Sequence, residues 1–332
     1  MTDIRTVKRT SEEENVLAKQ LKKAVDVNKM SLGKVLKKDF SKNKLIYLML
    51  LPLVLYYAIF HYTPLYGAII AFKEYSPSLG ILGSPWVGFE HFKEFIEGFY
   101  FKRLLINTLR ISVLSLLFGF PAPLILALLL NEIKNKPFKK AVQTITYLPH
   151  FISLVVVCGM VKDFVATEGV INDFLVMLGM ERGNLLARPE LFSGIYVTST
   201  IWQEVGWGSI IYLAALSSID MELYEAAKVD GAGRLRQTFT ITIPGIMPTI
   251  IILLLMRMGK MLNVGFEKII LLYNPVTYDT ADVISSYVYR KGLQEFNWSF
   301  SSAVGLFNSL INFVLIISAN MLSSKLNDTS LW

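Results

Sequence analysis

The sequence predicts an all-α, polytopic membrane protein with six transmembrane helices. The first observation is composition: 53% of the 332 residues are hydrophobic, only 18% are charged, and the mean hydropathy is +0.47. The second is arrangement, because the apolar residues fall in runs long enough to cross a bilayer. The third is a polar segment, residues 225–244, placed between two of these runs. A soluble domain needs less apolar material than this chain carries.

Six runs are predicted to span the membrane, and all but one lack charge. The exception is the fourth run, which is interrupted only by Glu204. The first run follows a charged tail of 44 residues, so it lies too deep in the chain for a cleaved signal peptide. The runs are residues 45–72, 111–131, 141–161, 191–219, 237–256 and 296–324.

Basic residues predict that both termini are cytoplasmic, because Lys and Arg in short flanking loops stay on that side. Segments 1–44, 131–141, 217–243 and the C-terminal tail hold 20 of the 33 Lys and Arg residues, and the outer loops hold 9. The predicted divisions are a basic cytoplasmic tail (1–44), a first transmembrane helix with its outer loop (45–103), a core of five helices with a cytoplasmic loop at 217–243 (104–325), and a C-terminal tail (326–332).

The net charge of +7 is explained by a membrane setting. The tail over residues 1–44 carries 12 basic and 6 acidic residues, and residues 17–36 have a loose helical periodicity. Two interpretations stay open: an amphipathic segment on anionic lipid, or a disordered tail whose lysines enforce topology. Neither involves nucleic acid.

The polar segment predicts a helix-turn-helix that docks on another protein. Asp220 can cap a helix over residues 221–229, residues 230–233 break it, and a second helix over 234–242 should stop at Pro244. Ala226 and Ala227 have little bulk, so a groove can close on them, while Glu225 offers a charge to an Arg or Lys. The alternative is an amphipathic interface helix that only orients the spans.

The spacing of this segment resembles a known motif. Glu-Ala-Ala, three residues, Gly, nine residues and Ile-x-Ile-Pro are similar to the cytoplasmic EAA loop of permease subunits in binding-protein-dependent ABC importers, with Ile243 where Leu is usual. The resemblance implies a type I ABC importer permease fold in the cell membrane. It also implies that the loop couples to an ATPase through Glu225, Ala226, Ala227, Asp230, Gly231, Ile241 and Pro244.

Further segments resemble the permeases of oligo- and polysaccharide importers, including lipoprotein-linked and alginate-oligosaccharide systems. This resemblance implies an oligosaccharide substrate, a second permease subunit forming a heterodimer, two ATPase subunits and an extracellular solute-binding protein. The chain has no GxxxxGK[ST] loop, so ATP and Mg should be held by the ATPase subunits, and no cofactor by this chain. The segments that match this subgroup are 263–267, 272–275, 280–283, 287–290 and 303–306. Segments 86–92, 107–108, 128–131 and 147–149 are similar to sugar-importer permeases in general.

Charged residues within spans are costly in lipid, so they should face protein or a wet cavity. One interpretation is a sugar path, in which aromatic faces stack on rings and polar groups bind hydroxyls. The alternative is an ion pair of Glu204 with Arg257 or Lys260. Without such pairing, the two cations would indicate an acidic sugar. The candidate path residues are Trp202, Gln203, Glu204, Trp207, Arg257 and Asn263.

Catalytic and metal sites are not expected. His61, His91 and His150 lack metal-ligand spacing, Cys158 has no cysteine partner, and the acids show no pairing for acid/base chemistry. The predicted function is therefore transport of an oligosaccharide, not enzyme catalysis. Two alternatives are a permease for a non-sugar solute, and a membrane sensor or scaffold docking a cytoplasmic partner. A continuous polar cavity would favour transport, whereas a dry, Leu-packed centre would favour the scaffold.

Overall fold

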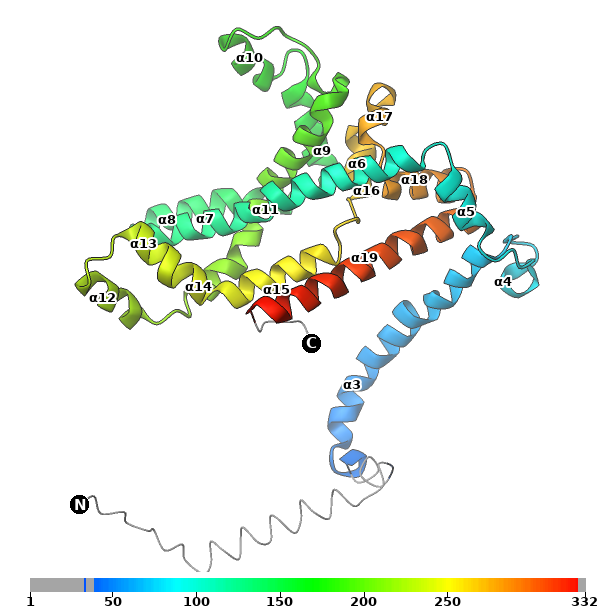
Figure 1. Ribbon diagram of the computed structural model, residues 1–332, viewed down its shortest axis with the longest axis horizontal. Helices are drawn as coiled ribbons and strands as arrows, with labels where there is room; N and C mark the ends of the chain where they lie inside the picture. Colours follow the sequence, from blue (N-terminus) through cyan, green and yellow to red (C-terminus); the bar gives the residue numbers. More distant parts are fainter. Residues whose placement is uncertain (1–32, 34–38, 328–332) are drawn as a thin grey trace, which may run out of the picture. The chain divides into compact units, whose positions relative to one another are not determined.

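The computed structural model describes residue 33 and residues 39–327 (Figure 1). In this part of the chain the regular elements are helices, and the one strand-like feature is an isolated bridge between Lys73 and Trp86. The all-α class is confirmed. Almost all of the segment 17–36 lies outside the described residues. The chain divides into two compact units, residues 1–67 and 68–332, each described by itself.

The first unit contains a long apolar helix. α3 (Lys44–Tyr57) continues through η1 (Ala58–Tyr62) into η2 (Thr63–Phe72), which crosses the boundary between the units. The whole stretch of 29 residues is long and apolar enough to cross a membrane. α3 has no buried residue, so its apolar side chains are available all around to hydrocarbon or to another protein.

The second unit is a helical bundle with short connecting helices. Its elements are α4 (Gly80–Gly83), α5 (Glu90–Glu97), α6 (Phe101–Leu114), η3 (Ser115–Gly119), α7 (Pro121–Glu132), α8 (Lys136–Tyr147), η4 (Leu148–Phe151), α9 (Leu154–Val165), α10 (Val170–Met177), η5 (Leu185–Ala187), η6 (Pro189–Leu191), α11 (Phe192–Leu216), α12 (Met221–Val229), α13 (Arg234–Gln237), η7 (Thr238–Thr242), α14 (Ile243–Gly245), α15 (Met247–Met258), α16 (Phe266–Leu272), η8 (Pro275–Thr277), α17 (Tyr278–Ala281), α18 (Ile284–Tyr289), η9 (Arg290–Gln294) and α19 (Trp298–Asn327).

Two predicted spans are bent beside prolines, which were expected to kink the helices. Among the described residues three helices are long and apolar enough to cross a membrane, and two bent pairs bring the number to as many as five. The third run breaks by 104° between α8–η4 and α9–α10, beside Pro149 and the N-cap Ser153. The fifth breaks by 63° between α14 and α15, where Pro248 follows. Proline removes a backbone donor, so both breaks have a local cause.

The second helix of the polar segment ends later than expected. Pro244 was expected to stop it after Thr242, but α13, η7 and α14 continue the helical path to Gly245. η7 is a π-helical turn, and Pro244 lies in the first turn of α14, where a missing N–H is tolerated. The path ends instead at Ile246, with φ −104° and ψ 7°.

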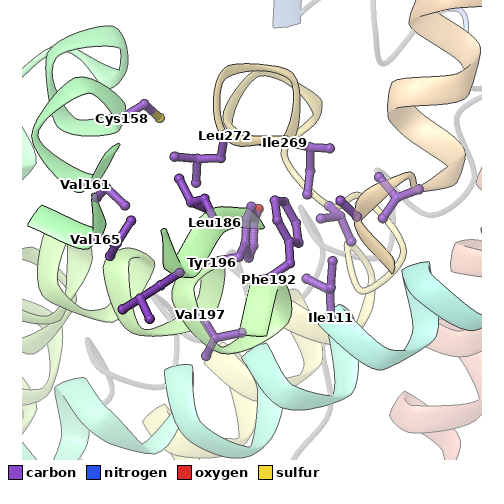
Figure 2. Close-up of a cluster of buried hydrophobic side chains, with 14 of the residues drawn as sticks. Ile111, Cys158, Val161, Val165, Leu186, Phe192, Tyr196, Val197, Ile269 and Leu272 are labelled. Carbon is purple, nitrogen blue, oxygen red and sulfur yellow. The ribbon is translucent and has the colours of Figure 1, made fainter. Parts of the chain in front are cut away.

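The largest apolar core joins helices distant in the sequence (Figure 2). Ile111 of α6, Val161 of α9, Phe192 of α11 and Ile269 of α16 are all buried in it. α11 also packs very closely on α8, because an added Cβ at Gly206 would lie 2.0 Å from the carbonyl oxygen of Thr146. α11 is thus the central helix against which the cavity-lining elements are positioned.

Candidate functional site

The segment from Asp220 to Gly245, called here the two-helix segment, forms at one end of the bundle (Figure 1). The Asp220 carboxylate accepts a hydrogen bond of 3.0 Å from the backbone N–H of Glu222, which caps α12 as expected. Gly231, with φ +75°, ends α12, and the Ala232 N–H donates to the Ala227 carbonyl at 2.9 Å. The left-handed glycine sets the direction of the chain into α13.

Contacts between the two helices hold the segment together. The Tyr224 hydroxyl lies 3.0 Å from Thr242 Oγ1, and the Gln237 amide donates to the Ala232 carbonyl at 2.7 Å. Arg234 lies 3.7 Å from Glu132 at the end of α7. The segment is therefore a built element and not a loose loop.

The surface of the two-helix segment combines small, apolar and charged side chains, and Glu225 is the charge predicted to anchor a partner. Glu225, Ala226, Asp230 and Pro244 are exposed, whereas Ala227 and Ile241 are half-buried. Exposed apolar side chains adjoin them: Met221, Leu223, Val229, Leu235 and Phe239. Exposed small residues flanked by apolar ones and a carboxylate are suited to a protein groove with a basic rim.

A second constellation lies on α11 and η4. Glu204 Oε2 is 2.9 Å from His150 Nδ1, and the His150 ring stacks on Trp207 with centroids 4.5 Å apart and planes 3° apart. The Phe151 ring packs edge-on against the Trp207 ring, with their centroids 5.6 Å apart. Glu204 is therefore paired with His150, and no ion pair in the described part of the chain joins it to Arg257 or Lys260.

One cavity adjoins this constellation, and a second lies next to the first. The first, of about 380 Å³, is lined by residues that include Glu204, Trp207 and Arg257. The second, of about 120 Å³, is lined by residues that include Arg257, Lys260 and Asn263. Because both are lined by Ser115, Thr200 and Arg257, they are neighbouring parts of one region, called here the path cavity. The lining of its larger part is mainly apolar, and the lining of its smaller part is mainly polar.

The structure brings together some predicted path residues and separates others. Glu204, Trp207, Arg257 and Asn263 line the path cavity, and the Asn263 side chain also accepts hydrogen bonds from Asn308 and Asn312 at 2.8 and 3.2 Å. Trp202 lines a different, mainly apolar cavity of about 830 Å³ between α9, α10 and α11. Gln203 is buried with 8% exposure and lines neither part of the path cavity.

Sequence reasoning missed His150 and Lys268. His150 was treated as an isolated histidine, because its partner Glu204 is 54 residues away. Lys268, in α16, is 5% exposed, donates to Thr200 Oγ1 at 2.9 Å and lies over the Tyr196 ring. Burial lowers the pKa of Lys268 to about 8. The only signal in the sequence was a lysine within an apolar stretch.

The chain belongs to the family of binding-protein-dependent transport system inner membrane components, whose pattern its residues 119–328 match. It is 46% identical over 292 residues to Protein LplB of Bacillus subtilis (88% of this chain, 92% of the relative). It is 44% identical over 292 residues to the polygalacturonan/rhamnogalacturonan transport system permease protein YteP of the same organism (88% and 91%).

Solved structures agree with this assignment. A chain in the crystal structure of a bacterial ABC transporter involved in import of the acidic polysaccharide alginate is 48% identical, with a TM-score of 0.81 and coverage of 88% of this chain and 99% of that one. The same transporter in complex with alginate pentasaccharide-bound periplasmic protein gives 47% identity, a TM-score of 0.82 and coverage of 89% and 99%. The fold is therefore the type I ABC importer permease fold.

Proposed function

We infer that this chain is the transmembrane permease subunit of an ATP-driven importer, and that it translocates an oligosaccharide delivered by an external solute-binding protein. The observation that carries this function is the path cavity, because Glu204, Arg257 and Asn263 line it beside an aromatic stack, where a scaffold would have a dry centre. Sugar rings present apolar C–H faces to aromatic rings and hydroxyls to polar groups. The oligosaccharide is favoured over other solutes by the relatives that transport polygalacturonan/rhamnogalacturonan or alginate.

The proposed assembly contains a second permease subunit, two ATPase subunits and the binding protein. In the cell membrane this chain would have six spans, with α11 as the fourth, and both termini in the cytoplasm. The ion pair of Arg234 with Glu132 supports this topology, since it joins two segments that the basic residues assign to the same side. ATP and Mg would be bound by the ATPase subunits.

The two-helix segment would couple ATP hydrolysis to transport. Its exposed Glu225 and Ala226 would meet a groove of the ATPase, with Ala227, Asp230, Gly231, Ile241 and Pro244 shaping the contact. A protein that only docks a cytoplasmic partner would also expose such a surface, but it would have no need for the path cavity. Because the docking surface alone does not distinguish a transporter from a scaffold, transport and coupling are tested in one experiment.

The test measures ATP hydrolysis by the complex in nanodiscs, with its companion permease, ATPases and binding protein, against neutral and acidic oligosaccharides. We expect stimulation by one class, loss of stimulation in Glu225→Lys, and no loss in Glu190→Lys, an exposed glutamate on a predicted outer segment. Normal transport by Glu225→Lys with the ATPase still bound would refute the coupling role. No stimulation by any sugar would favour another solute or the scaffold function.

A further inference from the structure

The charges around the path cavity are predominantly positive. Arg257 lines both parts of the cavity and Lys260 lines the smaller one, while Lys268 lies behind Thr200, which lines both. The only acidic residue among the lining residues is Glu204. Its carboxylate is already engaged by His150 at 2.9 Å. The cavity therefore presents a surplus of positive charge.

None of the three cations has an acidic partner. In the described part of the chain no carboxylate lies within 4.0 Å of Arg257, Lys260 or Lys268. Arg257 and Lys260 are exposed and can stay solvated without a partner, whereas a buried charge is normally paired because leaving water is costly. Lys268 bears this cost at 5% exposure, and its lowered pKa, about 8, reflects the same desolvation. An unpaired cation beside a cavity attracts an anion into it.

Two purely structural explanations, the helix dipole and snorkelling, do not account for all three cations. Arg257 lies in the last turn of α15, where the helix dipole favours a cation, but Lys260 and Lys268 lie beyond that helix. Snorkelling toward the membrane surface would place a cation among apolar residues and lipid headgroups. Around Lys260 the cavity wall instead includes Ser112, Ser115 and Asn263.

The geometry points to a carboxylate-binding subsite for an acidic oligosaccharide, formed by Arg257 and Lys260 with Lys268 reinforcing the positive field. Guanidinium groups bind carboxylates through two parallel hydrogen bonds, and lysine adds a point charge. The aromatic stack of Trp207 and His150 borders the same cavity and offers its apolar surface to a sugar ring. A uronate sugar combines these two features in one unit. This inference rests on the proposed oligosaccharide transport.

The experiment compares oligogalacturonate with its methyl ester, which has the same length and stereochemistry without the charge. The complex is held in nanodiscs of zwitterionic lipid, so that anionic headgroups do not occupy the site. For Arg257→Gln we expect the concentration of oligogalacturonate needed for half-maximal ATPase stimulation to rise about tenfold or more. Stimulation by the ester should change less than twofold.

Arg257→Lys and Lys93→Gln are the controls. Arg257→Lys keeps the charge but loses the two parallel hydrogen bonds, so its response to oligogalacturonate should lie between those of wild type and Arg257→Gln. This comparison does not require the ester, so it applies even if the binding protein rejects the ester. Lys93 is an exposed outer cation, with 72% of its side chain accessible, and its removal should have no effect.

The proposed subsite would be refuted if Arg257→Gln left the oligogalacturonate response unchanged. It would also be refuted if Arg257→Gln and Arg257→Lys weakened that response equally. A third refuting result would be an effect of Arg257→Gln that appeared only with anionic lipid present, because the cations would then bind lipid headgroups. Stimulation by neutral oligosaccharides alone would reject this inference and leave the proposed transport function intact. No stimulation by any oligosaccharide would reject the function itself.

Discussion

Two buried charges in the second unit differ in how they are stabilised. Asp282, with no exposure, accepts hydrogen bonds from Arg290 at 2.8 and 2.6 Å and from Ser286 at 2.6 Å. Hydrogen bonding to Asp282 raises the pKa of Arg290. Lys268 has only a hydroxyl partner and an aromatic ring. The first charge is neutralised by an opposite charge, whereas the second is held by neutral groups and adds to the positive field behind Thr200.

Asp282→Asn should destabilise the protein strongly. The substitution leaves the half-buried Arg290 guanidinium facing a neutral amide, and breaking a buried pair costs about 3–5 kcal/mol. Asp279→Asn removes a carboxylate 2.7 Å from Arg103 that is 81% exposed, so it should cost about 1 kcal/mol or less. Melting temperatures in detergent measure both. Equal effects of the two variants would show that Asp282 is not a structural anchor.

Lys268→Met should stabilise the protein at neutral pH and flatten part of its pH dependence. Because the native pKa of Lys268, about 8, lies below the usual 10.5, the penalty of burying the charge is complete below pH 8 and declines as pH rises toward 10.5. The gain of about 3 kcal/mol at pH 7 should therefore shrink as pH rises toward 10.5. Melting temperatures against pH measure it, with Lys93→Met as the exposed control. A gain independent of pH would contradict this assignment.

At the scale of elements, local sequence signals were sufficient to predict features that depend only on neighbouring residues. The cap at Asp220, the extent of α12 and the turn at Gly231 follow from helix capping and glycine chemistry, and the structure has all three. The prolines beside the breaks at Pro149 and Ile246 suggested kinks, but the size of each bend could not be predicted from a proline within an apolar run. Tertiary packing decides between them.

Gly231→Ala should weaken coupling more than Gly233→Ala. Gly231 has φ +75°, which costs an L-residue about 1 kcal/mol, although no atom lies within 4 Å of an added Cβ. Gly233 has φ −68° and equally open space, so alanine is tolerated there. Substrate-stimulated ATPase activity should therefore fall in the first variant only. The same activity in both would mean that the direction of α13 does not matter for coupling.

Gly206→Ala should prevent normal folding. The new Cβ would lie 2.0 Å from the Thr146 carbonyl oxygen, and two helix backbones would have to separate, at about 3 kcal/mol or more. Gly194, on the same helix, has no atom within 4 Å of an added Cβ and should accept alanine. Yield of monodisperse protein and melting temperature distinguish them. A Gly206→Ala variant as stable as wild type would require α8 and α11 to be further apart.

At the scale of the whole molecule, composition was enough for the all-α membrane class, and the spacing of residues 225–244 was enough for the family. The path cavity was only partly predictable. Glu204, Trp207, Arg257 and Asn263 were found because polar or aromatic residues in apolar runs are conspicuous. His150 and Thr200 were not, since their roles depend on partners 54 and 68 residues away. Helical periodicity alone could not show that Trp202 borders another cavity.

The topology can be tested by single cysteines in right-side-out membrane vesicles. Native Cys158 is 1% exposed and should react little with an impermeant maleimide, so it gives a low background. Lys134→Cys and Lys228→Cys should be labelled only after permeabilisation, whereas Lys93→Cys and Glu190→Cys should be labelled at once. Labelling of Lys228→Cys in intact vesicles would place the two-helix segment outside the cytoplasm and exclude its coupling role.

The bend between α14 and α15 has a mechanical consequence. Pro244 and Pro248 lack a backbone N–H, so few main-chain hydrogen bonds oppose a change in the 63° angle. We expect a torque applied to the two-helix segment to change the angle between α14 and α15 at Ile246. α15 would then swivel instead of sliding through the bilayer. A force applied by the ATPase to the two-helix segment would then move Arg257 sideways, together with any anion bound to it.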